Sequence, residues 1–152
     1  MPRAFKLALA SLAVLVLSIG TAQADTFTYS GDTFLNPAGS FNRPVEGGES
    51  SSVLATDVAY STFQFNVSTG GSYSFLSTSQ EEFIFDPFLV LYSGSFNPGN
   101  PTANFVAAND NLNGIEDLLQ SGFTTNLSSG TSYFLVTTGY FKPRFRRICE
   151  CH

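Results

Sequence analysis

Apolar and polar residues alternate along much of the chain, and this period of two is the feature that most limits the fold. Every second residue is apolar from Ser61 to Val67, and the alternation resumes at Tyr73 and Phe75 after the turn Ser68-Thr69-Gly70-Gly71. Successive side chains of a β-strand point to opposite faces of its sheet. The pattern therefore predicts two strands with one solvent-facing side each, joined as a hairpin.

The same features recur along the rest of the chain. Residues 88 to 92 are apolar on both faces, which is typical of a central strand, and residues 105 to 108 follow after a loop rich in Pro, Gly and Asn. A second hairpin is predicted from 122–127 and 132–138, shorter strands at 26–30 and 52–59, and one or two helical turns at 115–120. Together these predict an all-β fold, an antiparallel β-sandwich or jelly roll. If its C-terminal edge is truncated, we expect an exposed edge strand that is prone to pairing.

The aromatic residues fit a packed sandwich. The chain has sixteen Phe and no Trp. Periodicity predicts that five of the Phe side chains point inward, namely Phe63, Phe65, Phe75, Phe88 and Phe134. Tyr92, Tyr133 and Tyr140 are the better candidates for stacking on a ligand, because tyrosine keeps a polar group in water. The alternative for these tyrosines is a half-buried position on a strand.

The N-terminus has the three parts of a secretory signal. Arg3 and Lys6 precede an apolar stretch at residues 7–19 that is too short to span a bilayer, and Ala22-Gln23-Ala24 is a cleavage motif. We expect cleavage between Ala24 and Asp25, which releases a secreted or cell-surface protein without a transmembrane anchor. The predicted organisation is a signal peptide at 1–24, a β-sandwich domain at 25–141 and a tail at 142–152.

Charge is distributed unevenly over the expected mature chain. Residues 25–141 hold eleven acidic residues and one basic residue, Arg43, which gives a formal charge of about −10. Binding to nucleic acid requires a basic surface, so nucleic acid is not an expected partner. Cations, neutral polar surfaces and glycans are compatible with this charge.

The tail differs in composition from the body. Residues 142–152 contain four basic residues, both cysteines and the single histidine. Cys149, Cys151 and His152 could supply soft metal ligands, but structural zinc sites use four ligands with longer Cys-x-x-Cys spacing. We expect a disordered tail, and a change of reading frame near Phe141 is a more specific hypothesis for its origin.

A run of oxygen-bearing side chains at residues 109–114 resembles the start of a calcium loop. Asn109, Asn111 and Asn113 alternate before Gly114, but carboxylates are missing from the positions that give such loops their affinity. An EF-hand is therefore not predicted. The candidates for a looser calcium site are Asp86, Asp110, Glu116 and Asp117. The alternative is that these side chains cap turns by bonding to nearby backbone amides.

The sequence does not predict an enzyme. Glu81-Glu82 and Glu116-Asp117 are neighbours, and neighbouring side chains on a strand point to opposite faces instead of forming an acid–base pair. A Ser-His-Asp triad requires a histidine in the fold, and the single histidine is His152. No cofactor is expected apart from the calcium ion discussed above.

Several motifs together resemble a known family. They are Phe85 to Tyr92 with its Phe-Asp-Pro start, Ser95 to Pro98, Ala108 to Asp110, Ser121 to Thr124 and Val136 to Tyr140. These are similar to a family of bacterial secreted β-proteins that usually carry a C-terminal PEP-CTERM sorting signal, with a fold similar to the pre-peptidase C-terminal domain. The family pattern would continue to Pro-Glu-Pro, an apolar helix and basic residues, and only basic residues follow Tyr140 here.

The resemblance implies a role at the cell surface or in the extracellular matrix. We therefore expect a non-catalytic exported protein with a structural or adhesive β-sandwich module. Its partners would be extracellular polysaccharide or other surface proteins. The alternative is an accessory module of the pre-peptidase C-terminal type that binds glycan or calcium.

Overall fold

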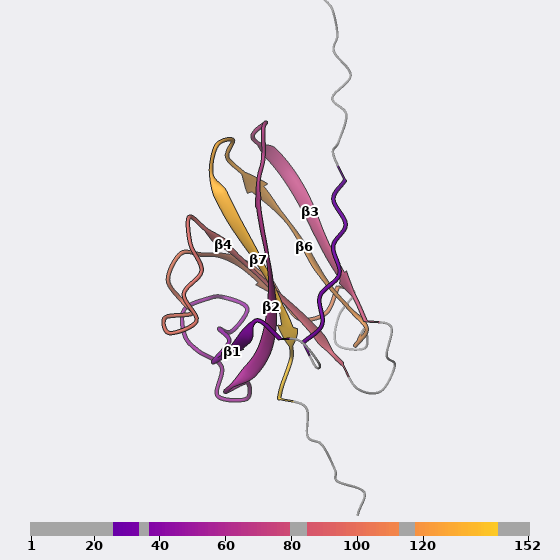
Figure 1. Ribbon diagram of the computed structural model, residues 1–152, viewed down its shortest axis with the longest axis vertical. Helices are drawn as coiled ribbons and strands as arrows, with labels where there is room; N and C mark the ends of the chain where they lie inside the picture. The colour runs from indigo at the N-terminus through magenta and orange to yellow at the C-terminus, as the bar shows by residue number, and fades with distance from the viewer. Residues whose placement is uncertain (1–25, 34–36, 80–84, 113–117, 143–152) are drawn as a thin grey trace, which may run out of the picture.

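The protein consists of two antiparallel β-sheets packed together, as the sequence predicted. The computed structural model describes residues 26–33, 37–79, 85–112 and 118–142 (Figure 1). The described residues form seven strands: β1 (Gly39–Phe41), β2 (Val58–Asn66), β3 (Gly71–Thr78), β4 (Pro87–Ser93), β5 (Phe105–Asn109), β6 (Gln120–Leu127) and β7 (Ser132–Gly139). The predicted signal peptide and the residues after Lys142 lie outside the described part. No helix in the described ranges is long and apolar enough to cross a membrane.

The larger sheet has the strand order β1-β2-β7-β4-β5, and every pair of neighbours in it is antiparallel. β7 lies in the middle, with Val136 opposite both Thr62 of β2 and Val90 of β4. β3 and β6 form the second sheet. Strands β2 and β7 are far apart in sequence, so the central pairing of the fold is a long-range one.

The two predicted hairpins are wrong. β2 and β3 follow each other around a tight turn but belong to different sheets, and the same is true of β6 and β7. Each turn therefore carries the chain from one sheet to the other, and the amide of Gly130 donates to the carbonyl of Val67 where the two turns meet. Alternation shows which side chains share a face, but it does not distinguish a hairpin from an arch whose apolar faces oppose each other. Here Phe65 of β2 packs against Phe75 of β3 across the two layers, with 5.9 Å between the ring centroids.

The interior between the two sheets is apolar and rich in aromatic rings. Leu89 and Leu91 of β4 are fully buried there, and Phe65, Phe75 and Phe123 pack around them. Burial of a Leu or Phe side chain stabilises a fold by about 1.5–3 kcal/mol. This layer therefore supplies much of the energy that holds the second sheet in place.

The opposite face of the large sheet is covered by loops instead of a sheet. Phe88, Val90 and Tyr92 of β4 point to this side, where they cluster with Phe41 at the end of β1, and Phe96 of the β4–β5 loop packs against them. Phe134 packs on the same cluster, so four of the five Phe side chains predicted to point inward belong to or pack against one of the two cores. The fifth, Phe63, is half-buried and stacks on Phe65. β4 is buried on both faces, which confirms the predicted central strand.

Three local predictions differ from the structure. Residues 26–30 are not a strand: Tyr29 instead stacks on Phe63 of β2, with 4.7 Å between the ring centroids. In the predicted 52–59 strand, regular pairing begins only at Val58. Of the predicted helical turns at 115–120, Leu118 and Leu119 form a turn and Gln120 begins β6, while residues 115–117 lie outside the described part.

Candidate functional site: the Arg43 cleft

An open cleft of about 660 Å³ lies at one end of the large sheet. Its walls come from the loop between β1 and β2, the start of β4, the end of β5 and the residue after β7. We call it the Arg43 cleft, and its main polar residues are Arg43, Glu46, Glu49, Asp110, Asn111 and Tyr140. The antiparallel register brings these segments together, because Pro87 faces Gly139 and Leu89 faces Asn109.

Arg43 is the only basic residue of the predicted domain, and it is buried with 2% of its surface exposed. Its guanidinium carbon lies 3.8 Å from the centroid of the Phe88 ring and 4.8 Å from that of Tyr140. A cation over an aromatic face gains about 0.5–2 kcal/mol, and more as water is removed. The two rings therefore offset part of the cost of burying this charge.

The hydrogen bonds of Arg43 go to backbone carbonyls of its own chain. Nε and Nη2 donate to the carbonyl oxygen of Tyr140 at 2.9 and 2.7 Å, and Nη1 donates to that of Pro44 at 3.0 Å. Burial lowers the pKa of Arg43, and the negative charges of Asp110, Glu46 and Asp86 act in the opposite direction. Arg43 thus connects the β1–β2 loop to the chain that leaves β7.

The loop that carries the acidic rim is shaped by a glycine. Gly48 has a φ of +75°, which is a conformation that glycine adopts without strain. A Cβ at this position would lie 2.3 Å from an atom of the Phe105 ring, so the loop also requires the close approach that only glycine allows. Glu46 and Glu49, on either side of this turn, are both exposed at the cleft.

Two of the predicted calcium ligands, Asp86 and Asp110, are brought together beside this cleft. The pKa of Asp110 is raised to about 6, mainly by burial and next by the charge of Asp86, while Arg43 partly opposes this effect. Burial also raises the pKa of Asp86, against the effect of Arg43. The Oδ1 atoms of Asp86, Asp110 and Asn111 are buried, and none has a hydrogen-bond partner among the described residues.

The asparagine-rich turn is held by backbone and hydroxyl contacts. Asn109 Oδ1 accepts from the amide of Gly122 at 3.1 Å, and the Asn109 carbonyl accepts from Ser121 Oγ at 2.6 Å. The amide of Asp110 donates to Glu46 Oε1 at 2.8 Å. Asn109 thus connects the end of β5 to β6 through its side chain and its carbonyl, instead of capping a turn through a nearby amide.

The predicted calcium site is only partly covered by the structure. Glu116 and Asp117 lie outside the described residues. Within the described ranges, no three His, Cys, Asp or Glu side chains gather closely enough to hold a metal ion. A calcium site here would combine Asp86 and Asp110 with amide oxygens, because calcium accepts six to eight oxygen ligands of mixed type.

Two of the three tyrosines considered for ligand stacking are buried. The hydroxyl of Tyr92 donates to the carbonyl of Pro101 at 2.8 Å, and that of Tyr133 accepts from the amide of Ser128 at 2.9 Å. Both satisfy their polar group inside the fold, so neither offers a stacking surface. Tyr140 is half-buried and lines the cleft.

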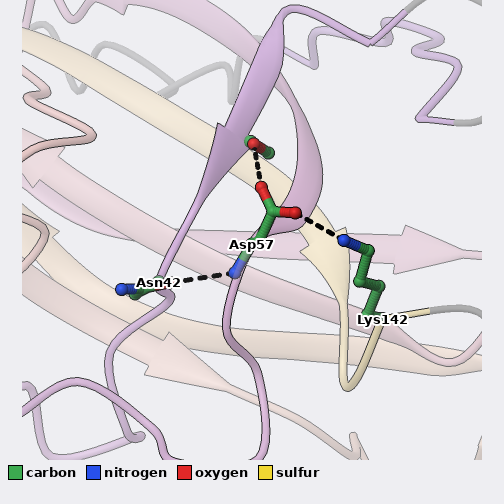
Figure 2. A network of polar contacts seen from close by, with 4 residues as sticks. Asn42, Asp57 and Lys142 are labelled. Atoms are coloured by element: carbon green, nitrogen blue, oxygen red, sulfur yellow. Dashed lines mark hydrogen bonds and ion pairs between the residues drawn. The ribbon is translucent and has the colours of Figure 1, made fainter.

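An ion pair is formed by Lys142, two residues after Tyr140 (Figure 2). Lys142 Nζ contacts Asp57 Oδ2, and the other carboxylate oxygen of Asp57 accepts from Ser40 Oγ. The backbone amide of Asp57 donates to Asn42 Oδ1 at 2.9 Å. These contacts lower the pKa of Asp57, with the Lys142 bond as the largest cause.

Sequence reasoning missed Arg43 and Glu46 as members of the site. A signal for Arg43 was present, because a single arginine among eleven acidic residues is unusual. Nothing in the sequence marked Glu46, which reaches Asp110 from 64 residues away.

Two chemical features meet at the cleft. One is the buried guanidinium of Arg43, which is bonded to backbone carbonyls. The other is the carboxylate pair Asp86 and Asp110, whose Oδ1 atoms have no hydrogen-bond partner among the described residues. Such a pair can hold a proton or a cation between its members. No family model, curated protein or solved structure matches the chain.

Proposed function

We propose that this chain is a non-catalytic exported protein whose β-sandwich is a structural or adhesive module at the cell surface or in the extracellular matrix. The N-terminal signal pattern supports export. The resemblance of Phe85 to Tyr92 and the later motifs to secreted bacterial β-proteins supports the surface or matrix role. Extracellular polysaccharide and other surface proteins are the partners that this role implies.

The main structural support for the proposal is the set of hydrogen bonds that Arg43 makes. All of its bonded nitrogens donate to main-chain carbonyls, and its guanidinium lies over the rings of Phe88 and Tyr140. A reaction centre needs charged groups that can reach a substrate. The central charge of this cleft instead fixes the ends of two segments, as expected for a rigid scaffold.

Fractionation of a bacterial culture that expresses the full chain tests the proposal. The expected product is extracellular or surface-bound and begins at Asp25. It should also be retained on intact cells or on their isolated matrix, and a variant with a disrupted apolar segment at 7–19 should stay inside the cell. A mature product found only in the cytoplasm, or one that is never retained on cells or matrix, would contradict the proposal.

A calcium-binding module is the second candidate, and the orphaned oxygens of Asp86, Asp110 and Asn111 favour it. A ligand that binds only the native state raises the melting temperature. Calcium should therefore raise Tm above the value in a chelator, and the increase should be larger at pH 7.5 than at pH 5, where Asp110 is largely protonated. Equal melting temperatures in calcium and chelator would eliminate this candidate.

A further inference from the structure

The basic residues near the end of the chain follow closely after a residue that lines the Arg43 cleft. Basic residues are concentrated after Phe141, at Lys142, Arg144, Arg146 and Arg147. Tyr140, which lines the cleft, is two residues before the first of them. The basic segment therefore starts at the edge of the cleft.

The surface around this starting point is acidic. Glu46 and Glu49 are exposed on one wall of the cleft, and Asp110 is half-buried on another. Arg43 is the only cation among the residues that line it, and its charge is buried. An exposed cation near the cleft would therefore meet mainly negative charge.

The cleft also has an exposed apolar wall. Val53 and Leu54 line it with 89% and 65% of their surface exposed. A partner that carries both positive charge and an apolar side chain would match these two walls. The sequence Arg144-Phe145-Arg146-Arg147 has this composition.

Lys142, the first basic residue after Phe141 and two residues after Tyr140 of the cleft, is bound to the fold. Lys142 pairs with Asp57, whose amide is held by Asn42, the residue before Arg43 (Figure 2). Asp57 has a φ of +54°, which asparagine and aspartate tolerate better than most residues. Lys142, the first basic residue after Phe141, therefore contacts the fold within the described residues.

We propose that the Arg43 cleft binds the basic segment Arg144–Arg147 of the same chain, with its arginines facing Glu46 and Glu49 and Phe145 against Val53 and Leu54. The length of the chain permits this, because the seven residues that follow Tyr140, up to Arg147, can extend over about 23 Å. Tethering adds an effective concentration of about millimolar for a short flexible connection. The inference goes beyond the proposed function, and a cleft occupied in this way is closed to other cationic ligands.

The two cysteines allow a direct test, because both lie in the tail and the body has none. In the mature chain with Cys149→Ser, a nitroxide on Cys151 should broaden the amide signals of Gly47 and Asn111 in an NMR spectrum. Gly130, in the turn between β6 and β7, is separated from Tyr140 by the eight-residue strand β7, so it is the internal control and should be affected least. Adding salt should reverse the broadening, because exposed ion pairs are screened over about 10 Å at 0.1 M.

Variants separate the charge contacts from general proximity. Replacing Arg144, Arg146 and Arg147 together with Gln should reduce the broadening at Gly47 to the level seen at Gly130. Glu49→Gln should reduce it in part, whereas Asp32→Asn, which removes the same charge from the N-terminal segment, should leave it unchanged. Glu49 is the better probe because Glu46 also holds the Asp110 amide.

Three results would overturn the proposal. The first is equal broadening at Gly47 and Gly130 at low salt, and the second is broadening at Gly47 that survives the triple arginine substitution. The third comes from a mixture of spin-labelled chain and unlabelled ¹⁵N chain. If the ¹⁵N chain is broadened at Gly47 there, the cleft is occupied by the tail of a second copy instead of its own.

Discussion

The two faces of the large sheet are both buried, but they are covered by different means. On one face, Leu89 and Leu91 meet the aromatic side chains of the β3–β6 sheet. On the other, Phe88 and its neighbours are covered by loops, and Arg43 lies between Phe88 and Tyr140. The sheet-covered face is packed mainly by apolar side chains, although the buried Ser121 hydroxyl bonds to the backbone of Leu89 and Asn109 there. The loop-covered face also contains one buried cation and its three bonds to the backbone.

Phe88→Ala should lower the free energy of unfolding more than the other substitutions considered below. Truncation of a buried phenylalanine costs about 3–5 kcal/mol, and here it also removes the ring beneath Arg43. Leu91→Ala, on the sheet-covered face, should cost about 2–5 kcal/mol. Urea unfolding of both variants measures the difference. If Phe88→Ala costs less than about 1 kcal/mol, well below that range, the loop-covered face is not a packed core.

Arg43→Ala should have the next largest effect. It leaves the carbonyl oxygens of Tyr140 and Pro44 without their donors, and each unsatisfied buried group costs about 1–3 kcal/mol. Arg43→Lys is the matched control, because lysine restores the charge but not the planar pair of bonds to Tyr140. Its free energy of unfolding should lie between those of the wild type and Arg43→Ala. Equal stability of all three proteins would show that the buried cation does not hold this face.

The carboxylate pair should make the stability of this end depend on pH. The fold raises the pKa of Asp110 from its ordinary value of 3.8 to about 6. Between these two pH values the folded state therefore binds more protons than the unfolded state. The contribution of Asp110 to stability is therefore present below pH 4 and is lost as pH rises to about 6. Thermal unfolding of the wild type and Asp110→Asn from pH 4 to 7 measures it. Their melting temperatures should diverge with rising pH in favour of Asn, and parallel curves would contradict the prediction.

The Lys142–Asp57 pair should have the smallest effect. Both side chains are more than half exposed, so their attraction is weakened by solvent. Lys142→Gln should slightly lower the melting temperature at low salt and have no effect at high salt. Lys142→Arg, which keeps the charge, should behave like the wild type. A loss that persists at high salt would indicate a role beyond charge.

The parts of this fold that depend on neighbouring residues were predictable, and the parts that depend on distant ones were not. Alternation identified the inward positions of Phe65 and Phe75, and the unbroken apolar run identified β4 as central. The same alternation led to two false hairpins, because strand partners are chosen by long-range packing and not by turn length alone. Residues 26–30 alternate like a strand, yet Tyr29 uses its ring and hydroxyl on Phe63 and Thr137 instead of pairing its backbone.

The candidate site was also predictable only in part. Asp86 and Asp110 were identified from the sequence, and the register of β4 and β5 places them at the same end. Their link to Arg43 and Glu46 was not visible, because it depends on how the β1–β2 loop folds over the end of the sheet.

Hydrogen exchange at the side-chain Nε–H of Arg43 tests most directly whether a buried cation holds the loop-covered face. Residues 25–152 contain four arginines, and the three others, Arg144, Arg146 and Arg147, follow Lys142. We predict one Nε–H signal that exchanges far more slowly than the others and that is absent from the spectrum of Arg43→Lys. Exchange of all four signals at the same fast rate would contradict the account, because an exposed guanidinium could not hold Tyr140 and Pro44 in place.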